Sequence, residues 1–393
     1  MKLAFVVQRY GLEVNGGAEL LCRQVAEHLS KYFDIDIITT CAIDYITWKN
    51  EYRPGKKNIN GLTIWRFPVD YPRDIGKFNK FSEKIFGDIS HEEDEQIKWM
   101  KLQGPYSTQL IDFIKVNSDA YDYFIFITYL YCTTFFGLPL VKDKAILVPT
   151  AHDEPPIYLN IFDKIFVSPK AIGYNTEEER LFVNNRFNNH HILNDVIGVG
   201  FEAPKEVSPN EFRDKYKISN KFLTYIGRID ESKGCGELFD YFMRYKEERR
   251  SDLKLILLGK SAMKIPEDED IIPLGFVSEE DKFNGIAASD FMIMPSKYES
   301  FSMVIMESWA CKKAVLVNGR CDVLKGHCLR SNGGLWYESY EEFKECLDLL
   351  ISDDRLRAKM GENGKQYVEE NYSWPKIEEK YLRLLDTLNS HRD

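Results

Sequence analysis

The sequence predicts an α/β protein with two domains, each built on a mostly parallel sheet. Short β-branched and aromatic runs alternate with longer helical patterns, which is typical of βαβ units. The chain has 393 residues, more than one ordinary core supports. The alternation also restarts after the proline-containing stretch EAPKEVSPNEF. We therefore expect two Rossmann-type domains joined near residues 200–210.

The expected strands are short and separated by helices. In the first half they are expected at 2–8, 34–40, 62–67, 122–127, 145–150, 164–168 and around 195–199, and in the second half at 222–227, 253–259, 271–276, 291–296 and 314–319. The segment 72–104, rich in lysine, aromatics and acids, is expected to be a helical insertion. The tail from Ser373 predicts an amphipathic helix with that serine as its N-cap.

Charge and cysteine content limit the class of protein. The net charge of -10 and the pI near 5.4 argue against nucleic-acid binding through a broad basic face, although they leave room for a local basic pocket. Eight cysteines without a CxxC pair indicate reduced thiols. The closest approach to a metal motif is Cys321, His327 and Cys328, which we interpret as packed thiols and a surface histidine, so no metal is expected.

No membrane span or export signal is expected. The apolar run at the N-terminus reaches a charge at Arg9, which is too soon for a signal-peptide core. The uncharged run 123–141 approaches the length of a span, but threonine, glycine and proline interrupt it. We interpret it as a strand, a loop and a short helix. The protein is expected to be cytoplasmic.

A glycine-containing loop, QRYGLEVNGGAE, follows the first expected strand. Gly16 and Gly17 would let the backbone approach a ligand where a helix begins, and helix N-termini favour anions. The loop is not GxGxxG, and the second strand ends in Thr39 and Thr40 without the acid that holds a nicotinamide ribose. A tight turn needed only for packing remains an open alternative.

The stretch PTAHDEPP places a histidine at the end of another expected strand. His152, with Asp153 and Glu154 beside it, lies where parallel sheets bind their ligands. Its imidazole could donate to a sugar hydroxyl or to a developing charge. A histidine that only orders the loop is the alternative.

Two cations follow a buried strand in YIGRIDESKG. Arg228 comes directly after the strand, and Lys233 lies in a turn closed by Gly234. A planar guanidinium and a point charge on one short loop suit a diphosphate. The alternative is that both cations only face solvent, but this does not readily explain an arginine directly after a buried strand.

The segment SKYESFSMVIMESWA places two acids around the start of a helix expected from about Phe301. Glu299 would precede the helix, and Glu307 would lie about two turns further on. The amides of Ser302, Met303 and Val304 would be unpaired and suited to an anion, and a carboxylate can grip vicinal hydroxyls. The plainer alternative, in which Glu299 caps the helix and Glu307 pairs with a lysine, stays open.

In this order and spacing, the motifs resemble those of a retaining glycosyltransferase of the GT-B fold, family 4 (glycosyl transferases group 1). The carriers are the NGGAE loop, the histidine of PTAHDE, the GRIDESKG loop, the pair Glu299 and Glu307, and the terminal YSW helix. The resemblance implies two Rossmann-like domains facing across a cleft. Residues 1–203 would bind the acceptor and 204–372 the nucleotide sugar, and 373–393 would cross back onto the first domain.

The resemblance also implies roles for single residues. Gly16 and Gly17 would leave room for the donor, Arg228 and Lys233 would neutralise its diphosphate, and Glu299 would contact hydroxyls of the transferred sugar. The amides of Phe301, Ser302 and Met303 would hold sugar or phosphate, and Glu307 would bind the ribose. His152 would act on the acceptor side. The residues assigned to catalysis are thus His152, Arg228, Lys233 and Glu299.

By this resemblance the chain would transfer a hexose-type sugar from a nucleotide-diphosphate donor, UDP or GDP, without a cofactor. The acceptor would be a glycan or a lipid-linked glycan in surface polysaccharide or glycoconjugate synthesis. A nucleotide-sugar epimerase and a non-catalytic glycan-binding relative are the alternatives. The lysine-rich insertion around 77–101 is where peripheral contact with the inner face of the membrane is expected.

The chain departs from the family pattern at Ser302, Lys312 and Ala314, and it has NGRCDVLKGHC where the family has a glycine-rich loop with an acid. SFS stands where the family has G-F-G, which places Ser302 near the donor. Lys312 and Ala314 replace the usual glycine and proline after the helix that carries Glu307. These departures affect recognition of the donor sugar more than the type of reaction.

Overall fold

The computed structural model describes residues 1–14, 16–87 and 91–390. The chain divides into two compact units: unit 1 comprises residues 1–200 and 377–393, and unit 2 comprises residues 201–376. Each unit is an α/β fold around a mostly parallel sheet, which confirms the expected fold class. Asn15 of the NGGAE motif and residues 88–90 of the insertion lie outside the described residues.

The described strands of unit 1 form one sheet in the order β3-β4-β2-β1-β5-β6-β7-β8. All neighbours pair in parallel except β3 and β4, which pair antiparallel at one edge. The strands are β1 (Lys2–Val6), β2 (Asp34–Thr40), β3 (Gly55–Ile59), β4 (Leu62–Phe67), β5 (Tyr123–Ile127), β6 (Ala145–Val148), β7 (Ala171–Tyr174) and β8 (Leu193–Val196).

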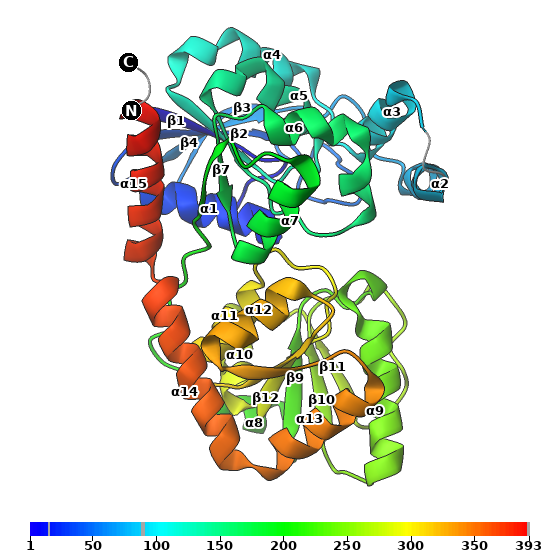
Figure 1. Ribbon diagram of the computed structural model, residues 1–393. Helices are drawn as coiled ribbons and strands as arrows, with labels where there is room; N and C mark the ends of the chain where they lie inside the picture. The colour runs from blue at the N-terminus through cyan, green and yellow to red at the C-terminus, as the bar shows by residue number, and fades with distance from the viewer. Residues whose placement is uncertain (15, 88–90, 391–393) are drawn as a thin grey trace. The chain divides into compact units, whose positions relative to one another are not determined.

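Helices cover both faces of this sheet, with α4 and α5 on one side and α1 on the other (Figure 1). Their bounds are α1 (Gly17–Leu29), α2 (Ile75–Gly87), α3 (Glu93–Gln103), α4 (Thr108–Val116), α5 (Cys132–Gly137), α6 (Asp163–Val167), α7 (Glu177–Phe187) and α15 (Trp374–Ser390). Because side chains of a strand alternate between its faces, each strand can bury residues against both helical layers.

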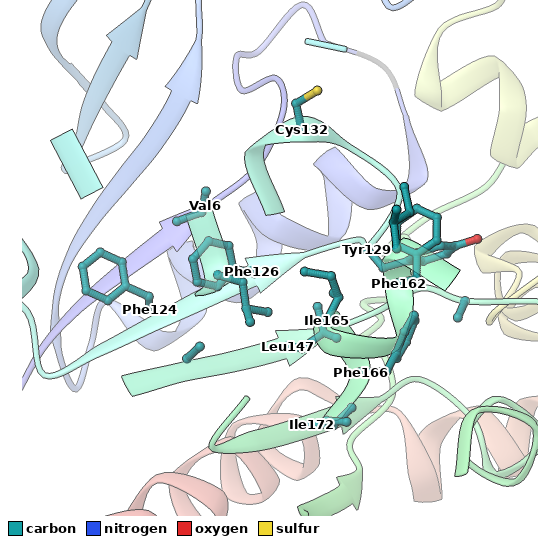
Figure 2. Close-up of a cluster of buried hydrophobic side chains, with 14 of the residues drawn as sticks. Val6, Phe124, Phe126, Tyr129, Cys132, Leu147, Phe162, Ile165, Phe166 and Ile172 are labelled. Carbon is teal, nitrogen blue, oxygen red and sulfur yellow. The ribbon is translucent and has the colours of Figure 1, made fainter. Parts of the chain in front are cut away.

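The core on the α4 and α5 side is rich in aromatic side chains. Figure 2 shows Phe126 of β5 and Leu147 of β6 in this core, with Ile165 and Phe166 of α6 in the same cluster. The rings of Phe166 and Phe187 stack with their centroids 4.2 Å apart. Buried aromatics of this size contribute strongly to core stability.

The C-terminal helix α15 belongs to unit 1 from Ile377 onward and lies beside α1 (Figure 1). Glu378 accepts hydrogen bonds from Lys31 and Tyr32, at 2.8 Å each, and its Oε1 lies 2.7 Å from His28 Nδ1. Burial alone would raise the pKa of Glu378, but these hydrogen bonds outweigh it and lower the pKa to about 2. Buried apolar residues complete the contact: Ile377, Tyr381, Leu384, Leu385 and Leu388.

The described strands of unit 2 form a parallel sheet in the order β11-β10-β9-β12-β13-β14. They are β9 (Phe222–Ile226), β10 (Lys254–Leu258), β11 (Ile271–Gly275), β12 (Phe291–Met294), β13 (Val315–Asn318) and β14 (Gly334–Tyr337). The helices are α8 (Pro209–Tyr216), α9 (Cys235–Arg249), α10 (Glu279–Ala288), α11 (Met303–Ala310), α12 (Asp322–Ser331), α13 (Tyr340–Ser352) and α14 (Asp354–Asn371).

One expected strand is wrong and three strands were not predicted. Of residues 164–168, expected as a strand, 164–167 fall in α6 and Ser168 is its C-cap, because Ile165 and Phe166 pack beside Phe162 in a helical turn. A short apolar run does not distinguish the two conformations. The unpredicted strands are β3, whose residues are largely exposed, β7 and β14.

The uncharged run 123–141 is a strand, a loop and short helices, as expected. It comprises β5, α5 and a 3₁₀ segment that follows. Among the described residues, no helix combines the length and the apolar character needed to cross a membrane.

Candidate active site

In unit 2 the site is built where β9 and β12, neighbours in the sheet, both end. The loop after β9 carries Arg228 and a 3₁₀ turn, η5 (Glu231–Lys233), and the loop after β12 leads into α11. At Gly234 the two loops meet: its φ is +75°, and a Cβ there would lie 2.3 Å from the carbonyl oxygen of Pro295. Only glycine fits this approach.

Lys233 and Glu299 connect the two loops. The ammonium of Lys233 donates to Glu299 Oε1 over 2.7 Å, and the Glu299 side chain is 13% exposed. Burial would lower the pKa of Lys233, but the charge and hydrogen bond of Glu299 outweigh it and raise the pKa. The lysine is therefore a cation at neutral pH. Two residues 66 positions apart thus form one ion pair at the edge of the sheet.

Arg228 lies on the same loop and contacts its own neighbours. Its Nε donates to Asp230, and its Nη2 donates to Ser232 Oγ over 3.3 Å. Burial would raise the pKa of Asp230, but the hydrogen bonds of Ser232 and Arg228 lower it. Asp230 also accepts the amide of Lys233 at 2.9 Å and so caps η5. The loop therefore carries two cations with different partners: Arg228 is held by Asp230, and the ammonium of Lys233 is held by Glu299.

The helix after Glu299 begins at Met303, two residues later than expected, and Ser302 is its N-cap. Ser302 is in the left-handed region, with φ +69° and ψ 81°, and makes no side-chain capping bond. Its hydroxyl is buried and has no partner among the described residues. The backbone thus adopts at Ser302 the conformation that a glycine would favour, although a serine occupies the position. Glu299 does not cap α11.

Glu307 is buried in α11 and forms an ion pair with α10. Its Oε1 accepts from the ammonium of Lys282 over 2.7 Å, so part of the plainer alternative for this acid holds. The second oxygen, Oε2, is buried without a partner among the described residues. Burial raises the pKa of Glu307, against the opposing effect of Lys282. An unsatisfied buried oxygen is costly and suggests a missing hydrogen-bond donor.

Lys312, the second departure from the family pattern, has a left-handed backbone conformation like that of Ser302. It follows α11 with φ +57°, the left-handed conformation in which helices often end on glycine. The side chain extends to Glu362, with Nζ 2.8 Å from Oε1. Ala314, the third departure, is fully buried just before β13. The backbone conformation is thus that of a glycine at both Ser302 and Lys312.

In unit 1 the loop after β1 is organised by a buried ion pair that was not predicted. Arg9 Nε and Nη2 contact Glu19 Oε1 at 2.7 and 2.6 Å, and Gln8 donates to the same oxygen over 2.9 Å. A Cβ on Gly16 would lie 2.1 Å from Glu19 Oε2, whereas one on Gly17 would meet nothing within 4 Å. Gly16 therefore makes room for Glu19.

His152 lies in the loop after β6, held by the residues around it. The amide of Glu154 donates to the His152 carbonyl over 2.9 Å, and His152 Nδ1 lies 3.5 Å from Glu154 Oε1. Tyr129, which follows β5, donates to the same oxygen over 2.8 Å. The imidazole is about a quarter exposed. Its position at the carboxyl edge of a parallel sheet is the one expected for a ligand-binding residue.

The interpretation of His327 as a surface histidine is wrong. The residue is fully buried in α12, where its Nδ1 lies 3.0 Å from the Tyr367 hydroxyl, and burial lowers its pKa to about 3. Cys321 and Cys328 are packed thiols, as expected. Within the described ranges, no three His, Cys, Asp or Glu residues are grouped so as to hold a metal ion.

Comparison with known proteins shows similarity to glycosyl transferases. Residues 209–367 match the model of the family described as Glycosyl transferases group 1. An uncharacterized glycosyltransferase of Methanocaldococcus jannaschii is 24% identical over 98% of this chain and 97% of its own length. A Campylobacter jejuni enzyme, N-acetylgalactosamine-N,N'-diacetylbacillosaminyl-diphospho-undecaprenol 4-alpha-N-acetylgalactosaminyltransferase, is 30% identical over 42% of this chain and 44% of its own.

The fold is shared with solved structures along the whole chain. Anabaena HepE, determined in complex with UDP and glucose, aligns with a TM-score of 0.69 and 14% identity, covering 98% of this chain and 99% of its own. The segment that matches the family model contains the two loops and α11 described above. Over residues 209–367 the chain is thus similar to the glycosyl transferases of group 1, and its fold is GT-B.

Proposed function

We propose that this glycosyltransferase moves a hexose-type sugar from a nucleotide-diphosphate donor to a glycan or lipid-linked acceptor, with retention of anomeric configuration. The reaction would serve surface polysaccharide or glycoconjugate synthesis. Unit 2 would bind the donor and unit 1 the acceptor.

The observation that carries the proposal is the pairing of Lys233 with Glu299 at the ends of β9 and β12, with Arg228 on the same loop. As the nucleotide diphosphate leaves, negative charge grows on the phosphates and positive charge on the anomeric carbon. Two cations and the N-terminal amides of α11 would stabilise the phosphate charge. The carboxylate of Glu299 would grip hydroxyls of the transferred sugar.

The buried acid of α11 supports recognition of a ribose. Glu307 Oε1 is taken by Lys282, whereas Oε2 is unpartnered among the described residues. A ribose hydroxyl donating to Oε2 would satisfy that oxygen. Lys282 favours the ionised form of the acid against the effect of burial, because its ammonium lies 2.7 Å from the carboxylate.

The relatives support the choice of donor and acceptor. HepE was solved with UDP and glucose, and the name of the Campylobacter enzyme specifies a diphospho-undecaprenol-linked glycan. We therefore propose UDP or GDP as the carrier, with no added cofactor. His152 is assigned to the acceptor side, where it would contact the incoming hydroxyl or the reacting sugar. No glycosidase-like pair of nucleophile and acid is proposed, and front-face attack accounts for retention.

A lipid-linked acceptor would bring the protein to a membrane surface, and α2 is the segment we propose for that contact. The helix carries Lys77, Lys80 and Lys84, and Ile75 and Phe86 are exposed on it. Cations beside exposed apolar side chains suit an anionic lipid surface. Flotation with phosphatidylglycerol vesicles at low salt tests this contact. Absence of the protein from the floated fraction would refute it.

The test of the function is calorimetric binding of UDP, GDP, ADP and dTDP, followed by assays of their sugars for transfer and hydrolysis. We expect one nucleotide to bind at micromolar concentrations and its sugar to be consumed with release of the nucleotide. Binding of none of the four would overturn the proposal. Conversion of the donor to its epimer without transfer would identify an epimerase instead.

A further inference from the structure

Glu179, near the start of α7, is a buried acid whose carboxylate connects the ends of two strands. The residue is 2% exposed. Its Oε1 accepts the amide of Ala151, after β6, over 2.6 Å, and its Oε2 accepts the amide of Asn175, after β7, also over 2.6 Å. Burial raises the pKa of Glu179 to about 8, while its hydrogen bonds with the amides of Asn175 and Ala151 act in the opposite direction. The loops that follow the neighbouring strands β6 and β7 are thus joined through one side chain.

The loop that Glu179 holds is the one that carries His152. Ala151, whose amide Glu179 binds, directly precedes the histidine. The residue before it, Thr150, is in the left-handed region with φ +48°, which is unfavourable for a β-branched residue. Such a conformation persists only where the surroundings enforce it. The hydrogen bond from the Ala151 amide to the carboxylate is a direct means of enforcing it.

Further hydrogen bonds fix the loop on the C-terminal side of His152. The Glu154 amide donates to the His152 carbonyl over 2.9 Å, and Tyr129 fixes the Glu154 carboxylate. Tyr129 holds Glu154 through a side chain, whereas Glu179 binds the backbone. The backbone before His152 is therefore held by Glu179, through the Ala151 amide, and the backbone after it is held at Glu154. Glu179 also links the loop to Asn175, the residue after β7.

We propose that Glu179 is a positioning residue for the transfer reaction, acting through His152. The inference rests on the proposed function, which assigns His152 to the acceptor side. Catalysis is sensitive to displacements of about 1 Å, which can cost about a hundredfold in rate. A side chain that fixes the loop at its first residue controls the position of the imidazole without touching substrate.

The test compares Glu179→Gln with the matched control Glu177→Gln. The glutamine keeps the size of the side chain but offers one acceptor oxygen for two amides. Glu177, two positions earlier on the same turn, pairs at the surface with Arg180. With the nucleotide sugar found in the donor panel, we expect Glu179→Gln to lower kcat ten- to a hundredfold with the donor KM changed less than twofold. Glu177→Gln should match the wild type.

A double-mutant cycle with His152→Ala separates positioning from a general loss of stability. If Glu179 acts through His152, the variant with both changes should turn over no more than twofold slower than His152→Ala alone. Losses that multiply, or a Glu179→Gln enzyme as fast as the control, would overturn the inference. A His152→Ala enzyme with wild-type turnover would also overturn it, since His152 would then have no part in the transfer.

Two further measurements keep the outcome clear. Nucleotide binding belongs to unit 2, so calorimetry should give the same affinity for Glu179→Gln and the wild type. If the wild-type protein binds no nucleotide, the proposed function is refuted rather than the role of Glu179. Should the glutamine variant fail to fold, Glu179→Asp, which keeps both oxygens on a shorter side chain, takes its place. It should show the same non-additivity with His152→Ala.

Discussion

The ammonium of Lys233 lies 2.7 Å from the carboxylate of Glu299, and this contact joins the loops that follow β9 and β12. Each group balances the charge of the other in the absence of ligand. A diphosphate and a sugar would give the lysine and the acid separate partners. The pair thus holds both groups close to the places where the proposed reaction needs them.

Replacement of either member should abolish most of the transfer activity. Lys233→Ala and Glu299→Ala are each expected to lower kcat by about 10²–10³, the usual effect of removing one group that stabilises developing charge. Both proteins should remain folded, because neither side chain contributes to the core. Lys297→Ala is the control. Lys297 lies in the loop after β12, as Glu299 does, but its ammonium pairs with Glu237. Near-normal turnover in either variant would refute the role given to that residue.

Glu307 should discriminate ribose from deoxyribose. In the wild type, calorimetry is expected to show about tenfold weaker binding of the 2'-deoxy form of the preferred nucleotide, since a hydroxyl that satisfies Glu307 Oε2 is lost. Glu307→Gln should bind the ribose form less tightly and reduce the difference. The control is Glu279→Gln. Glu279 also contacts Lys282, but its side chain is 81% exposed, and the variant should still prefer the ribose form to the deoxyribose form. An unchanged preference in Glu307→Gln would contradict ribose binding at this position.

Glycine at the two left-handed positions should stabilise the protein. Ser302→Gly and Lys312→Gly each relieve a conformation that costs about 1–2 kcal/mol in a residue with a Cβ, and the greater freedom of unfolded glycine offsets part of that gain. We expect each change to raise the free energy of unfolding in urea by about 1 kcal/mol. For Lys312 the lost contact with Glu362 is exposed and worth little. A lower unfolding free energy for Ser302→Gly would indicate that the buried hydroxyl stabilises the loop.

The docking of α15 should depend on acid pH through Glu378. Its pKa is about 2 in the folded protein and near 4.5 when unpaired, so the unfolded chain binds more protons between these values. The stability that this group contributes is therefore complete above about pH 4.5 and is lost as pH falls toward 2. Glu378→Gln should flatten this part of the stability profile, measured by urea unfolding from pH 6 to pH 2.5. Glu379→Gln, at the neighbouring exposed position, is the control.

Much of the unit 2 site could be predicted from local sequence. Arg228 and Lys233 are framed by a buried strand and a glycine, so their place at the edge of the sheet followed from the order of residues. Glu299 was likewise placed by the strand before it. Since β9 and β12 are adjacent in the sheet, the two predicted loops meet. The backbone at Ser302 was not predictable, because serine gives no local sign of a left-handed conformation.

Residues whose role depends on tertiary contacts were missed. Glu179 is the third of three consecutive glutamates, a pattern that ordinarily indicates acids near a helix N-terminus, and only the rotation of α7 buries this one. Lys282 is paired with Glu307 across two helices, 25 positions apart. His327 carried no local sign of burial either. Such pairings arise when elements pack, so no short stretch of sequence reveals them.

The return of the chain to unit 1 has a consequence for synthesis. Unit 2 is inserted between Gly200 and Ile377, and its two ends pair with each other, Phe201 donating to the carbonyl of Tyr372 over 2.8 Å. On the ribosome, unit 2 can close on itself while unit 1 still lacks α15, the helix that lies beside α1. The apolar surface that α15 buries stays open until residues from Ile377 onward emerge. A stalled or truncated chain would therefore carry a finished second unit and an unfinished, aggregation-prone first one.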